Sequence, residues 1–285
     1  MVIDLLAGPF MEFAFMRRAL VAVVALALGA APLGALLTLR RLSLVGDALS
    51  HAVLPGVALG FMFFGLSLTA LSIGGVLAGM LVVLAAALVS RHTRLAEDAS
   101  LAALYLVALA LGVMLISLHG SQIDLLHILF GNVLGVDRDG LLLVAGVASA
   151  TLLLLALMYR GLLIESFDPA FLAAGQGGRA WFQQLFLMLV VVNLVAAVQT
   201  LGTLMAVGLM MLPAISARLW HDTLAAQLLH SAGCAMLAGL AGLLLSYYAA
   251  LPSGPSIIVC AGLLYGGSLL LSPRGVLATL RRART

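Results

Sequence analysis

The chain has no lysine and little charge of either sign. Only 9% of its 285 residues are charged, and all 14 basic residues are arginines. Because soluble domains carry about 25% charged residues, the composition excludes an ordinary soluble domain. The missing lysine excludes a P-loop nucleotide site, since that motif needs its lysine to reach the phosphates. If the chain takes part in ATP-driven transport, a separate polypeptide must supply the ATPase.

Cysteine is almost as scarce. Cys234 and Cys260 are the only two, and both lie in apolar runs. A disulfide framework is therefore not expected, and buried, inert thiols are the default interpretation. The first twelve residues contain two acidic side chains and no basic one. Without a positively charged n-region, we expect no cleaved signal peptide.

Apolar sequence is what the chain has in abundance, since 64% of its residues are hydrophobic. A membrane-spanning helix needs about 20 apolar residues. Hydropathy therefore predicts an all-α fold, a polytopic transmembrane helical bundle of about eight to nine spans, forming a single domain over residues 1–285. The spans are expected near residues 16–39, 45–66, 68–90, 100–118, 140–159, 181–199, 202–219, 225–249 and 255–272.

The placement of arginine predicts the orientation of these spans. Loops on the cytoplasmic side of a membrane carry the excess of basic residues. One orientation puts eleven arginines in the cytoplasm and leaves only Arg17, Arg18 and Arg138 outside. With nine spans, the N-terminus is then external and the C-terminus cytoplasmic. Arg17 and Arg18, at the start of the first span, are exceptions to this rule.

Asp47 and His51 stand four residues apart inside the second predicted span. Four residues are about one helical turn, so both side chains project from one face. Burying an ionisable group in a bilayer costs about 2.5–3.5 kcal/mol on insertion scales, and such residues usually mark an ion or substrate pathway. A carboxylate and an imidazole are also suitable ligands for a divalent transition metal. The pair therefore predicts a transported metal ion.

His230 and Cys234 repeat this spacing in the eighth predicted span. At about 1.5 Å per helical residue, His51 lies about 15 Å beyond Arg41, and His230 about 12 Å beyond Asp222. Both histidines then reach similar depths in a core about 30 Å thick. If the two helices are neighbours, the four side chains offer O, N and S ligands to one ion. The alternative is a histidine hydrogen-bonded to a neighbouring helix and a cysteine that only packs.

Two of the longer connections between the predicted spans contain candidate functional residues. The external segment 119–139 contains His119, Asp124 and His127. These residues either form a site where the ion enters or are ordinary side chains in contact with water. In the cytoplasmic loop 160–180, an aspartate suited to N-capping precedes a proline suited to the first helical position. A short amphipathic helix there would dock on another protein or rest on the membrane surface. The residues assigned to this contact are Glu165, Phe167, Asp168, Pro169 and Phe171.

Glycine and proline interrupt several of the predicted spans. Pro55 and Gly56 follow His51 by about one turn, and Gly202 and Pro213 interrupt the sixth and seventh spans. Broken helices beside a polar residue at mid-membrane depth are typical of transport sites.

Residues 39–56, which read LRRLSLVGDALSHAVLPG, resemble the signature of the zinc/manganese/iron class of bacterial ABC-transporter permeases. The resemblance extends over nearly the whole chain. Further matching segments are Leu95–Asp98, Leu129–Asn132, Ser166–Pro169, Leu212–Ala214 with Ala217 and Arg218, and Leu251–Pro255.

The resemblance implies a permease subunit of a metal importer in the bacterial plasma membrane. Its implied partners are cytoplasmic ATP-binding subunits, a second permease subunit (identical or not), an external metal-binding protein and membrane lipid, with no nucleic acid. It places Asp47 and His51 on the family's intramembrane metal positions, and residues 165–176 on the coupling helix that seats on the ATPase. The ion, which is zinc, manganese or iron, is cargo, and no tightly bound cofactor is expected.

Two other transporter classes remain open on the sequence alone. An ion-coupled secondary metal transporter would use Asp47 and His51 as a relay and would work without an ATPase. An ABC permease for chelated iron or a vitamin would need a larger cavity and no ligand-type pair. An enzyme is not expected, because no convincing nucleophile and base are paired in the sequence.

Overall fold

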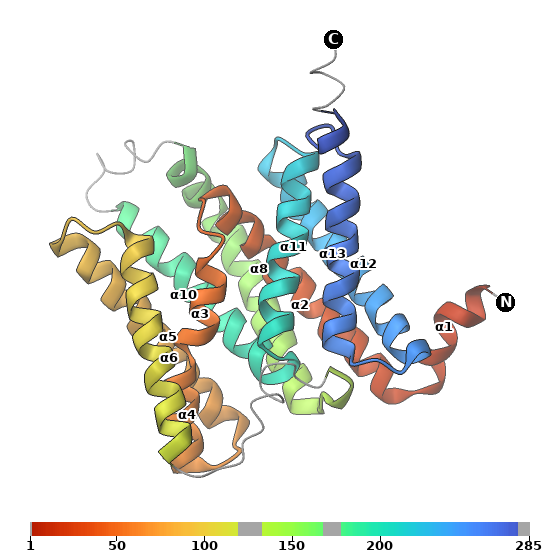
Figure 1. Ribbon diagram of the computed structural model, residues 1–285, viewed down its shortest axis with the longest axis horizontal. Coiled ribbons are helices and arrows are strands. Elements are labelled where there is room, and N and C mark those ends of the chain that lie inside the picture. Colours follow the sequence, from red (N-terminus) through yellow and green to blue (C-terminus); the bar gives the residue numbers. More distant parts are fainter. Residues whose placement is uncertain (1, 119–132, 168–177, 279–285) are drawn as a thin grey trace.

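The computed structural model of the chain describes residues 2–118, 133–167 and 178–278 (Figure 1). Over these ranges the chain forms helices joined by short turns, and no strand, as expected for an all-α membrane protein. The helices are α1 (Val2–Glu12), α2 (Ala14–Leu39), α3 (Val45–Ala52), α4 (Leu54–Phe64), α5 (Leu68–His92), α6 (Glu97–Leu118), the 3-10 turn η1 (Val133–Gly135), α8 (Arg138–Phe167), α10 (Gly178–Leu201), α11 (Thr203–Trp220), α12 (Leu224–Ala249) and α13 (Ser253–Leu271).

The described residues contain nine segments that are long and apolar enough to cross a membrane. Their bounds follow the predicted spans to within a few residues, because the length of each apolar run decides them. The fifth span differs most, since α8 continues beyond Arg160 to Phe167. Leu162 is buried there, and Gly161 packs so closely on the Phe182 ring of α10 that a β-carbon would overlap it. Packing against α10 therefore extends the helix into the predicted loop.

The second span is split into α3 and α4 at Val53. Pro55 has no N–H to donate to the carbonyl of His51, four residues before it. That carbonyl accepts the N–H of Val53 instead. The proline seen in the sequence thus separates an eight-residue half-helix, which carries Asp47 and His51, from α4.

Backbones touch where α4 crosses α5. A β-carbon on Gly56 would overlap the carbonyl of Gly74, and one on Gly74 would overlap the carbonyl of Gly56. A similar crossing joins α2 to α11, where a β-carbon on Gly34 would overlap the backbone of Met210. Small residues allow such close approach in membrane proteins, where helix association depends on van der Waals packing. These crossings fix α4 on α5 and α2 on α11.

The crossing of α4 and α5 yields a stability prediction. Gly74→Ala should lower the unfolding free energy by about 3 kcal/mol or more, because overpacking alone costs about 1–3 kcal/mol and the obstacle here is backbone. Gly146→Ala in α8 is the matched control, since a β-carbon there meets nothing within 4 Å. This control should be neutral or stabilising by up to about 1 kcal/mol, because glycine is the poorer helix former. Thermal unfolding of both variants in detergent checks the pair, and equal midpoints would contradict the crossing.

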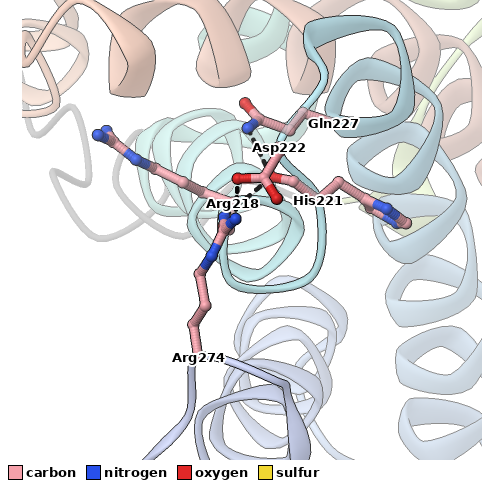
Figure 2. Close-up of polar contacts among 5 residues, drawn as sticks. All are labelled: Arg218, His221, Asp222, Gln227 and Arg274. Carbon is pink, nitrogen blue, oxygen red and sulfur yellow. Dashed lines mark hydrogen bonds and ion pairs between the residues drawn. The ribbon is translucent and has the colours of Figure 1, made fainter.

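Polar side chains close the end of the bundle at which α11 terminates (Figure 2). Arg274 forms an ion pair with Asp222 and donates to the carbonyls of Arg218 at 3.3 Å and His221 at 3.4 Å. Gln227 donates to the same His221 carbonyl at 2.8 Å. The last carbonyls of a helix lack partners within the helix and carry its negative dipole end, so these donors stabilise the terminus of α11.

Candidate metal site

Asp47 and His51 lie on one face of α3, as their spacing requires. His51 Nε2 is 3.8 Å from Asp47 Oδ1, which is a facing pair and too long for a hydrogen bond. The Asp47 side chain is 61% exposed and that of His51 28% exposed in the single chain. Both groups can therefore reach a ligand that approaches from outside this chain.

The remaining faces of α3 are buried, and this burial orients the pair. Val45 and Leu49 belong to the hydrophobic core, and Gly46 packs so tightly on the methyl groups of Met210 and Met211 that a β-carbon would overlap them. Ser50 is also buried and donates to the carbonyl of Asp47 at 2.7 Å. An amphipathic half-helix of this kind packs its apolar side against α6, α10 and α11 and leaves the acid and the imidazole on the open side.

His230 and Cys234 do not join this pair within one chain. His230 Nδ1 lies 3.1 Å from His221 Nε2, and its ring stacks on Trp220 with 6.2 Å between centroids. Within the described ranges, no group of three or more histidine, cysteine, aspartate or glutamate side chains is placed to hold a metal ion. Within the described part of the single chain, His230 therefore lies beside His221, and Asp47 and His51 form a pair without it.

The separation of His230 from Asp47 and His51 has a geometric reason. Counting residues from the membrane boundary gives depth along a helix and says nothing about which helices are neighbours. Helix α11 packs against both α3 and α12, and Figure 1 shows it between them. His230 matches the alternative stated for it from the sequence, a histidine hydrogen-bonded to a neighbouring helix. Its partner His221 stands at the end of α11.

The other predicted site residues lie at or beyond the edges of the described chain. Glu165 and Phe167 fall in the last turn of α8, where the structure describes the backbone only. The other six lie outside the described residues, namely His119, Asp124 and His127 of the predicted ion entrance and Asp168, Pro169 and Phe171 of the predicted ATPase contact. Helices α8 and α10 flank the segment predicted to contact the ATPase.

Two contacts between helices were not predicted from the sequence. Asn193 in α10 donates to Thr151 in α8 at 2.5 Å, and both side chains are buried. Arg40, at the end of α2, holds its guanidinium carbon 4.8 Å from the centroid of the Phe186 ring in α10. An asparagine within an apolar run was a readable signal for the first contact. Nothing in the sequence points to the partner in the second.

The comparisons with known proteins agree with this architecture. The model of the ABC 3 transport family matches residues 12–272. The manganese transport system membrane protein MntC of Halalkalibacterium halodurans is 34% identical over 276 residues, which is 96% of this chain and 93% of the relative. The manganese import system permease protein ScaB of Streptococcus parasanguinis is 34% identical over 264 residues, covering 92% of each chain.

A solved structure extends the likeness to three dimensions. PsaBC from Streptococcus pneumoniae, in complex with Fab, contains a chain that is 31% identical and superposes with a TM-score of 0.85, covering 99% of this chain and 100% of that one. The signature at residues 39–56, the nine membrane-spanning segments and these alignments over nearly the full length lead to one conclusion. The chain belongs to the ABC 3 transport family and is a multi-pass permease subunit of a metal importer, not an enzyme.

Proposed function

We propose that this chain is the permease subunit of an ATP-driven manganese importer, and that Asp47 and His51 bind the ion in transit. The observation that carries the proposal is the half-helix α3, which presents a carboxylate and an imidazole together inside a membrane span. The names of MntC and ScaB, both manganese transport proteins, support the choice of manganese over zinc and iron.

The chemistry of the pair suits Mn²⁺. Carboxylate oxygens are preferred by this ion, and imidazole nitrogen is accepted by most divalent transition metals. Octahedral ions take about six ligands, so one aspartate and one histidine leave most positions open. A second permease subunit that presents the same face, together with water, would complete the coordination. The 61% exposure of the Asp47 side chain in the single chain supports such sharing.

Transport proceeds by alternating access in this proposal. An external metal-binding protein delivers the ion, which pauses at Asp47 and His51. ATP binding and hydrolysis in separate cytoplasmic subunits then change which side of the site is open. The segment that seats on those subunits is residues 165–176, which begins in the last turn of α8 and precedes α10 in the chain. The host membrane is the bacterial plasma membrane.

The orientation rests on arginine at helix ends. The C-terminal ends of α2, α5 and α11 carry Arg40 with Arg41, Arg91 and Arg218, and Arg274 joins the same end of α11. Cytoplasmic loops favour basic residues, and cations also stabilise helix C-termini. This end of the bundle is therefore assigned to the cytoplasm, which leaves the N-terminus external.

Reconstitution in vesicles tests the function. The chain alone should give no Mn²⁺ uptake, whereas the complex with its ATP-binding subunits and metal-binding protein should take up Mn²⁺ only with hydrolysable ATP. Excess Zn²⁺ or Fe²⁺ should compete more weakly than unlabelled Mn²⁺ for ⁵⁴Mn uptake. Uptake by the chain alone, driven by an ion gradient, would instead support the secondary-transporter alternative.

A further inference from the structure

We propose that Arg40 is a positioning residue that links the helix pair α8 and α10 to the metal-binding half-helix α3. The inference rests on the proposed function, because it concerns how movement driven by ATP reaches Asp47 and His51. It assigns to one side chain the connection between the helices that flank the ATPase contact and the site that binds the ion.

Arg40 contacts both helices of the pair. Its guanidinium carbon lies 4.8 Å from the centroid of the Phe186 ring in α10, and its Nη2 donates to the carbonyl of Leu162 in α8 at 3.5 Å. Phe186 and Leu162 are 0% and 1% exposed, so the arginine rests on rigid, buried surface. A guanidinium over an aromatic face is attracted by the ring quadrupole, more strongly where water is excluded.

The corner between α2 and α3 consists of residues 40–44. It is short and held by backbone hydrogen bonds, which let it act as a rigid unit. The N–H of Leu42 donates to the carbonyl of Leu37 at 2.9 Å, and the N–H of Val45 to the carbonyl of Leu42 at 3.0 Å. Arg41 takes the left-handed conformation, with φ of 61°, in the position where a helix usually ends with glycine. Asp47 follows Arg40 by only seven residues.

A second arginine holds the same corner from the opposite helix. Arg218 of α11, drawn in Figure 2, donates to the carbonyl of Thr38 at 2.5 Å. The corner is therefore attached to α8 and α10 through Arg40 and to α11 through Arg218. A relative displacement of α10 and α11 must pull on the corner, and α3 begins three residues beyond Leu42.

A role in fold stability alone is the competing explanation, and the ratio of ions moved to ATP hydrolysed separates the two. The experiment uses the full complex in vesicles with Arg40→Ala, Arg40→Lys and Phe186→Leu. Mn²⁺ binding and ATP hydrolysis should stay near the wild-type level. The number of Mn²⁺ ions transported per ATP should fall by about tenfold, within the 5–150-fold range typical of coupling between sites.

Two variants serve as controls. Phe186→Tyr keeps the aromatic face and should keep the wild-type ratio. Arg91→Ala removes an exposed arginine from the end of α5 and should also keep it. Arg40→Lys keeps the positive charge, so the inference can still be judged if the alanine variant does not fold.

The outcomes are distinct. A parallel loss of ATP hydrolysis and transport in Arg40→Lys and Phe186→Leu, or an unchanged ratio in both, would overturn the role of Arg40. A wild-type complex that neither binds nor transports Mn²⁺ would overturn the proposed function instead. Wild-type transport with normal coupling in all Arg40 variants would leave the proposed function standing and remove this inference alone.

Discussion

Manganese uptake should fall by about a hundredfold or more in Asp47→Ala and in His51→Ala, because even the loss of a residue that only orients a metal ligand costs about 10–100-fold in metal affinity or activity. Each substitution removes one of the two ligands that the proposed site takes from this chain, and in a complex with two identical permease subunits it removes two. The measurement is ⁵⁴Mn uptake by cells that lack their own importer and express the variant.

His92→Ala is the matched control for these variants. His92 is exposed at the end of α5, where its ring contacts only the carbonyl of Leu88 among the interactions described for it. This variant should transport normally. Insertion of all three variants is checked by recovery of the complex with its ATP-binding subunits. Wild-type uptake by both site variants would refute the metal site.

Exchange of a ligand should change which ion is carried. In His51→Cys, Mn²⁺ uptake should be lost while Cd²⁺ or Zn²⁺ uptake is retained or gained, because a thiolate favours softer ions than an imidazole and a carboxylate do. Cysteine is smaller than histidine, and His51 is only partly buried, so the fold should accept it. Competition of each metal against ⁵⁴Mn and against ¹⁰⁹Cd measures the selectivity.

A matched variant separates ligand chemistry from damage. His51→Ser has nearly the same size as His51→Cys and lacks the thiolate, so it should carry neither ion well. If both variants lost Mn²⁺ and gained nothing, the side chain of His51 would be structural. A preference for Cd²⁺ that is present only in the cysteine variant would identify residue 51 as a ligand.

The sequence predicted the spans closely because a membrane sets their length. Nearly every predicted boundary lies within a few residues of the structure, and Pro55 correctly marked the division of the second span. The exception is α8, whose last turns contain nothing that hydropathy recognises as a span. They remain helical because Gly161 and Leu162 pack on α10, and such tertiary contacts cannot be derived from local composition.

The candidate site was only partly readable from the sequence. Spacing alone placed Asp47 and His51 on one face, because a helix repeats about every 3.6 residues. It could not show that His230 would meet His221 or that α11 would lie between α3 and α12. Arg40 was counted only as a charge, since its partner Phe186 is 146 residues away in the chain. Contacts at such distances depend on helix arrangement, which hydropathy does not encode.

The contact between Gly56 and Gly74 has a mechanical consequence for the second span. With carbonyl groups meeting and no side chain between them, α4 has no room to slide along α5. Helix α3 lies outside this contact, because the helix is interrupted at Val53 and the proline removes a hydrogen bond between the two halves. In the proposed transport cycle, a tilt of α3 about Val53 would therefore move Asp47 and His51 while α4 stays in place on α5.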